Sequence, residues 1–75
     1  MDIQSCYENL ANAIIIQAAK DYREVLRQLL YEPDNELAAM KKKKIEQFFQ
    51  SEFYCALTSI DGRTLIERLN EEVGR

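Results

Sequence analysis

Apolar residues in the first half of the chain recur every three or four positions, which is the spacing of one face of a helix. The repeat runs from about Ser5 to Tyr31 without a glycine or a proline, and good helix formers fill the positions between. We therefore predict a long helix over residues 5–31, with Ser5 as its N-cap and Glu8 completing a capping box. The apolar stripe comprises Tyr7, Leu10, Ala11, Ile14, Ile15, Ala18, Tyr22, Val25, Leu26, Leu29 and Leu30.

Turn-forming residues divide the rest of the chain into shorter segments. The proline at position 33 ends the first helix, and Asp34 or Asn35 can cap the next one. Further helices are expected over about residues 36–50, 52–58 and 63–73, with Asp61 capping the last and Gly74 ending it. Ser51 is either a cap or a kink, so the sequence leaves open whether the second and third helices are continuous. The predicted fold is all-α: a small helical bundle, one domain over residues 1–75, with a long N-terminal helix and two or three shorter ones.

Aromatic residues are concentrated around the predicted break at position 51. Phe48, Phe49, Phe53 and Tyr54 fall within seven positions, which is more than one helix face can hide. We expect most of this cluster to be core and either Tyr54 or Phe49 to be partly exposed. The tyrosines of the long helix are expected to have half-buried rings and hydroxyls in water: Tyr7, Tyr22 and Tyr31. The candidate partner-binding aromatics are Phe49, Phe53, Tyr54 and Tyr22.

The short length of the chain limits its core. A chain of 75 residues buries only about 60% of its unfolded surface, and natural scaffolds of this size add disulfides, a metal, regular helix packing or self-association. There is no histidine and there are only two cysteines, which excludes a four-ligand zinc site. We expect both cysteines, Cys6 and Cys55, to be small buried hydrophobes. A homodimer is one way to add stability, with the long helix pairing with its copy around Ala18, Tyr22 and Val25.

The sequence contains no signal for a membrane or for export. No basic region precedes an apolar stretch at the N-terminus, and no apolar run approaches the roughly 20 residues that cross a bilayer. We therefore expect a cytoplasmic protein with reduced thiols and no contact with the membrane.

Residue types that carry common catalytic chemistry are missing. Without histidine there is no Ser–His or Cys–His pair, and two glycines cannot make a phosphate-binding loop. Glu71 and Glu72 are adjacent on a predicted helix, so they point about 100° apart and cannot face one substrate. We predict a protein that binds without catalysis and without a metal or other cofactor.

Charge argues against nucleic acid as the main partner. Ten basic and thirteen acidic residues give a net charge of −3. Helical geometry splits the run Lys41–Lys44: Lys41 shares a sector with Leu37, Ala38, Ile45, Phe48 and Phe49, and we expect its methylenes to lie on the core. Lys42 and Lys43 point elsewhere and, with Arg63, are candidate partner-binding residues. A helix-turn-helix over residues 52–73 is conceivable, but its second helix has a net charge of −1, whereas phosphate contacts dominate DNA affinity.

One stretch of the chain resembles a known group of proteins. Residues 45–54 read IEQFFQSEFY, and the chain continues with ALT at 56–58, IDG at 60–62, Leu65, Ile66 and Leu69. This is similar to the pattern IExFFxSx(W/F)YxxLTxxDGxxLIxxL of small helical proteins encoded by phages and integrative elements of Gram-positive bacteria. In those proteins the pattern follows a segment like AIIIQAAKDYR at residues 13–23, so the resemblance covers most of the chain. The chain departs from it at Phe53, where tryptophan is common, and at Gln50, where arginine is common.

The resemblance implies a host-manipulating accessory protein of a mobile element, in a bacterial host cell, and it brings no catalytic residues with it. The leading hypothesis is therefore a protein-binding module, such as an inhibitor of a host defence complex in the manner of anti-CRISPR proteins. The alternatives are a nucleic-acid-associated helix-turn-helix regulator and a self-assembling structural protein.

Overall fold

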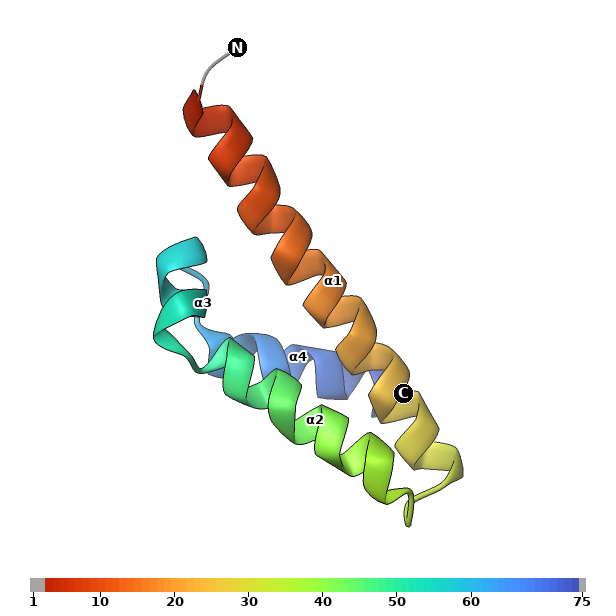
Figure 1. The fold of residues 1–75 in the computed structure, drawn as a ribbon. Coiled ribbons are helices and arrows are strands. Elements are labelled where there is room, and N and C mark those ends of the chain that lie inside the picture. The colour runs from red at the N-terminus through yellow and green to blue at the C-terminus, as the bar shows by residue number, and fades with distance from the viewer. Residues whose placement is uncertain (1–2, 75) are drawn as a thin grey trace.

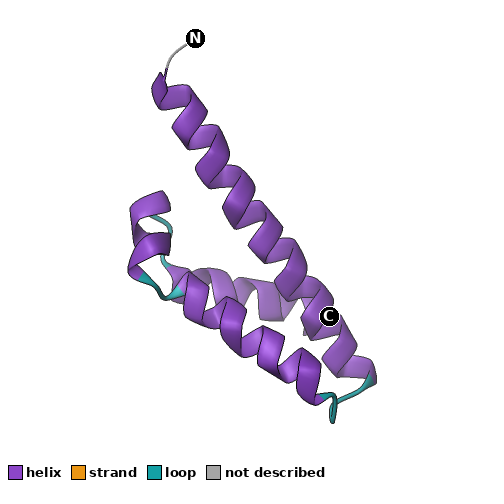
Figure 2. Ribbon diagram, in the orientation of Figure 1, coloured by secondary structure: helices purple, strands orange, loops and turns teal. Residues whose placement is uncertain are grey.

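Four helices make up the fold. The computed structural model describes residues 3–74, and the side chains of residues 10–74. The helices are α1 (Ile3–Tyr31), α2 (Glu36–Phe49), α3 (Glu52–Leu57) and α4 (Gly62–Gly74), and no strand occurs between residues 3 and 74. Figures 1 and 2 show the long first helix and the three shorter ones. The predicted all-α fold is confirmed, and the shorter helices begin and end within one residue of the predicted positions.

Side-chain caps separate the shorter helices. The Asn35 side chain accepts a hydrogen bond from the backbone N–H of Ala38 at 3.1 Å, which makes it the N-cap of α2. The Ser51 hydroxyl accepts from the N–H of Tyr54 at 3.2 Å and donates to the carbonyl of Phe48 at 2.6 Å. Ser51 therefore caps α3 and binds the end of α2, so the two helices are not continuous.

The predicted N-cap is confirmed for the last helix, α4, but not for the first helix, α1. Asp61 accepts hydrogen bonds from the Arg63 N–H at 3.4 Å and the Thr64 hydroxyl at 3.1 Å, in front of α4, as expected of a cap. By contrast, α1 already begins at Ile3, so the prediction that Ser5 is its N-cap is wrong. The predictions for the side chains of Cys6, Tyr7 and Glu8 lie outside the described residues.

The α1–α2 pair is an antiparallel hairpin, and α4 packs against one side of it. In Figure 1, α4 lies behind the two helices of the hairpin, and α3 follows the far end of α2. The N-terminal half of α1 continues past the other helices, which makes the molecule 47 Å long but only about 20 Å across. The opposite side of the hairpin has no helix over it among residues 3–74.

Each helix contributes a large side chain to the core. These side chains are Tyr22 of α1, Phe49 of α2, Tyr54 of α3 and Leu69 of α4. The Phe49 ring lies edge-on to Tyr22 and to Tyr54, at centroid distances of 6.0 and 5.6 Å. Phe49 and Tyr54 are each only 1% exposed, so the expectation that one of them would be partly exposed is wrong. The break at Ser51 lets α3 change direction, and this brings rings on both sides of the break into one core.

The Tyr22 hydroxyl links three helices inside the bundle. It donates a hydrogen bond to Oε2 of Glu46 in α2 at 2.6 Å and accepts one from Nδ2 of Asn70 in α4 at 3.1 Å. Burial, followed by the hydrogen bond to the Glu46 carboxylate, raises the pKa of Tyr22 to about 12. The side chain is fully buried, so the expected half-buried ring with a hydroxyl in water is wrong for Tyr22. Tyr31, at the end of α1, is exposed instead.

A close backbone approach joins the start of α4 to the end of α2. Gly62 is buried, and a Cβ added to it would overlap the carbonyl oxygen of Phe49. The φ angle of Gly62 is not positive, so the backbone conformation does not require a glycine. The lack of space for a side chain does. This contact holds α4 against the one side of the hairpin that it covers.

None of the helices described over residues 3–74 combines the length and apolar character that crossing a bilayer requires.

Candidate protein-binding site

The predicted partner-binding residues divide into buried and accessible ones. Tyr22, Phe49 and Tyr54 belong to the core, so a partner cannot reach them in this structure, and we remove them from the candidate site. The four that remain accessible are Phe53, Lys42, Lys43 and Arg63. Their role in binding stays a prediction.

The accessible candidates do not form one site. Phe53 lies on α3, 57% exposed, with its ring 6.1 Å from that of Phe48. Arg63 lines a hollow of about 330 Å³ at the start of α4, together with Asp61 and the exposed Cys55. Lys42 and Lys43 line neither this hollow nor the larger one described next. The exposure of Cys55 corrects the expectation of a buried thiol, because within the six residues of α3 only Tyr54 faces the core.

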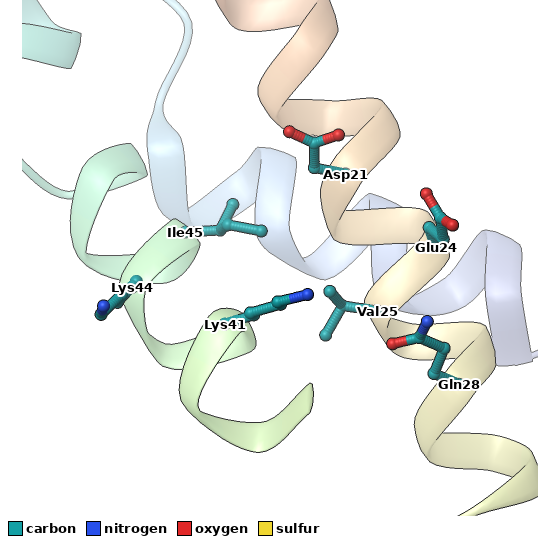
Figure 3. A pocket seen from close by; sticks show the side chains of 7 residues that line it. All are labelled: Asp21, Glu24, Val25, Gln28, Lys41, Lys44 and Ile45. Carbon is teal, nitrogen blue, oxygen red and sulfur yellow. The ribbon is translucent and has the colours of Figure 1, made fainter. Parts of the chain in front are cut away.

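A larger groove lies between α1 and α2, on the side of the hairpin that α4 does not cover. Its volume is about 430 Å³, and Figure 3 shows the seven side chains that line it. Val25 of α1 and Ile45 of α2 form an apolar floor. The remaining lining residues are Asp21, Glu24 and Gln28 of α1 and Lys41 and Lys44 of α2.

The two walls of this groove carry opposite charges. Asp21 and Glu24 are three positions apart, as are Lys41 and Lys44, so each pair lies along one face of its helix. Figure 3 shows Lys41 reaching from α2 towards α1 beside Val25. The only ion pair among the described residues joins Arg23 to Glu72 of α4, at 2.8 Å, so the four groove charges are not paired with one another. Their charge is therefore available to a partner.

Apolar residues extend the floor beyond the groove in both directions. On α1, Ile14 and Leu10 precede Asp21 by seven and eleven positions, which is two and three helical turns on the same face. On α2, Leu37 precedes Lys41 by four positions. Leu10 is 59% exposed and Leu37 is 64% exposed. The open side of the hairpin is thus an apolar strip flanked by charge, as is typical of a surface that binds another helix.

Sequence reasoning missed this groove because it assigned its α2 wall to the core. Leu37 and Lys41 share the predicted core sector of α2, but Leu37 is exposed and Lys41 lines the groove beside Val25. The signal was present: a lysine in the middle of an apolar sector on one helix, and two acidic residues three apart on the other. What the pattern could not show was that these faces lie next to each other.

The predicted pairing of α1 with its copy around Ala18, Tyr22 and Val25 is wrong. Tyr22 and Val25 are buried within the chain, and Ala18 packs against the same core. Tyr22 and Ala18 are covered by the chain's own helices, whereas Val25 also lines the groove. A second copy would have to bind on a side of the hairpin that those helices leave open.

Among the side chains of residues 10–74, no group of three or more cysteine or acidic residues is placed to hold a metal ion.

No family model, curated protein or solved structure matches this chain.

Proposed function

We propose that this chain is a small protein-binding module without catalytic activity, and that the α1–α2 groove takes a helix of its protein partner. The observation that supports this is the groove itself: an apolar floor of Val25 and Ile45 between walls of opposite, unpaired charge. An amphipathic helix that lays its apolar side into a groove is a common mode of peptide recognition.

The groove specifies the chemistry of the helix that it would bind. The apolar stripe of that helix would cover Val25 and Ile45. Basic side chains would lie beside the acidic wall of α1, at Asp21 and Glu24, and acidic ones beside Lys41 and Lys44 of α2. Complementary charges of this kind speed association and select the partner more than they raise affinity.

The biological setting of this binding comes from the resemblance described above. Similarity to small proteins of phages and integrative elements supports an accessory role for this module. In that role it would manipulate the host cell, for example by inhibiting a defence complex. The residues that carry the resemblance lie at 13–23 in α1 and from Ile45 to Leu69, so they include Asp21 and Ile45 of the groove but neither Lys41 nor Lys44.

Affinity capture from the lysate of a Gram-positive host tests the proposal when variants are compared. The bait is the full chain, and the groove variant is Lys41→Glu/Lys44→Glu. The matched control is Lys20→Glu/Arg27→Glu, which makes the same change in net charge at exposed positions of α1 that do not line the groove. All lysates are treated with nuclease and washed at moderate salt.

We expect the wild type and the control to retain the same bound proteins and the groove variant to lose them. Equal capture by the groove variant and the control would contradict the proposal. Material that disappears with nuclease treatment would instead favour the nucleic-acid regulator.

A further inference from the structure

We infer that the partner seated on the α1–α2 groove is a second copy of this chain, in a two-fold dimer whose hairpins stack face to face. The inference rests on the proposed function of the groove and names its occupant in the isolated protein; a helix of another protein would compete with the second copy for the same groove.

The first step is a symmetry requirement. In a two-fold dimer the same patch of both copies forms the interface, so each contact occurs twice and the patch must be complementary to itself. The open side of the hairpin meets this condition in charge, since two acidic residues on α1 are matched by two basic residues on α2.

The second step fixes the direction of the two-fold axis. If the axis runs parallel to the hairpin, each α1 lies over the α2 of the other copy. Asp21 and Glu24 then meet Lys41 and Lys44 of the second copy. These residues line one groove, so they lie at the same height along the hairpin, and rotation about this axis keeps that height. An axis across the helices would set α1 against α1, with acid facing acid.

The third step concerns the apolar surface that such a dimer would cover. Val25 and Ile45 lie between the charged walls, and the strongly exposed Leu37 lies on the same face of α2. Val25 is already only 5% exposed, so removal of Leu37 and the half-buried Ile45 from water supplies the attraction, while the charges set the register. A chain of 75 residues has a small core, and self-association is a common way for short chains to gain stability.

The charges allow a test by exchange. The variant Lys41→Glu/Lys44→Glu has two acidic walls, and the variant Asp21→Lys/Glu24→Lys has two basic walls. In the proposed dimer each variant alone sets like charges against each other. In an equimolar mixture the two acidic walls of one variant face the two basic walls of the other, so opposite charges meet again at every wall.

Sedimentation velocity over a wide range of protein concentrations measures the outcome. We expect a wild-type dimer, a similar dimer for the Lys20→Glu/Arg27→Glu control, and a dissociation constant raised about tenfold or more for each groove variant alone. The mixture should form a heterodimer of near wild-type affinity. Recovery on mixing also shows that both variants fold, and circular dichroism of each one checks this directly.

A wild type that is monomeric at every concentration would overturn the dimer, as would groove variants that dimerise like the wild type. Failure of the mixture to associate, with both variants folded, would overturn the charge pairing across the interface. These failures are distinct from failure of the proposed function: a monomeric wild type whose Lys41→Glu/Lys44→Glu variant still loses a captured protein overturns the dimer alone.

Discussion

The two sides of the α1–α2 hairpin are built by the same two helices, but one side is covered by α4 and the other is exposed to water. On one side α4 covers Tyr22 and Phe49, and Leu69 of α4 is only 2% exposed. On the other side Leu37 is largely in water and four charged residues surround Val25 and Ile45 without pairing. Both sides carry apolar residues, so apolar content alone does not distinguish a core face from a binding face.

Contacts at the two ends of α4 explain why only one side is closed. At its start, Gly62 allows the backbone to approach the carbonyl of Phe49. Further along, Asn70 donates to the Tyr22 hydroxyl and Glu72 pairs with Arg23. The exposed ion pair contributes little to stability, but the glycine contact and the part-buried hydrogen bond have no counterpart on the open side among the described residues.

The largest expected difference between the two sides comes from a matched pair of leucines. Leu69→Ala should lower the free energy of unfolding by about 2–5 kcal/mol, because it leaves a cavity in the core. Leu37→Ala, on the open side, should change it by less than about 0.5 kcal/mol in dilute protein. Urea unfolding followed by circular dichroism measures both. Similar losses for the two variants would contradict the assignment of one closed and one open side.

Alkaline pH should lower the free energy of unfolding through Tyr22, on the side of the hairpin that α4 covers. The pKa of Tyr22 is about 12 in the folded protein against 10.0 for the free side chain, so the folded state holds its proton more tightly. Its contribution is fully present below about pH 10 and is lost as the pH rises towards 12, a decrease on the order of 2–3 kcal/mol. Burial raises the pKa of Tyr54 as well, which acts in the same direction.

Unfolding free energies measured in urea at intervals from pH 9 to pH 11.5 should therefore fall. The fall should be smaller in Tyr22→Phe, which removes the larger titrating group. A stability that stays flat over this range would show that the Tyr22 hydroxyl is not held in the interior.

Removal of the Tyr22 hydroxyl should itself destabilise the protein near neutral pH. Tyr22→Phe deletes a hydrogen bond to a carboxylate and leaves Glu46 and Asn70 without their shared partner. We expect a loss of about 1.5–3 kcal/mol, the usual range for hydrogen bonds to charged groups. Thermal unfolding at pH 7 provides the measurement, and a neutral effect would contradict the three-helix link.

The smallest effect, with the opposite sign, is expected for the other buried tyrosine. The Tyr54 hydroxyl is buried and has no hydrogen-bond partner among the described residues. Tyr54→Phe keeps the ring contacts with Phe48 and Phe49 and removes an unsatisfied polar group. Stability should be unchanged or should rise by up to about 1 kcal/mol. A loss as large as that of Tyr22→Phe would mean that this hydroxyl has a partner.

The helices could be predicted from the sequence because their signals are local. Proline at position 33, the caps Asn35 and Ser51, and the helical spacing of apolar residues act within a few positions of one another. The N-terminal boundary of α1 was not predicted correctly, since α1 begins at Ile3, two positions before the Ser5 that was expected to cap it.

The candidate site could not be predicted because it depends on how the helices pack. A helical wheel places Leu37 and Lys41 near Ala38 and Phe49, but it does not say that α4 covers only part of that sector. In the same way, the rings of Phe49 and Tyr54 share a core only because the chain turns at Ser51. The acidic wall on α1 becomes part of a groove only once α2 lies beside it.

The most direct test of the binding face is a nitrogen–proton NMR spectrum of the wild-type chain recorded over a range of concentrations. As the concentration rises, we predict shifts and line broadening for the amides of Asp21, Gln28, Lys41 and Lys44 on the open side. The amides of Arg23 and Glu72, on the side of α4, should stay unchanged. Changes centred on Arg23 and Glu72 instead, or spectra that are identical at all concentrations, would contradict self-association through the open side of the hairpin.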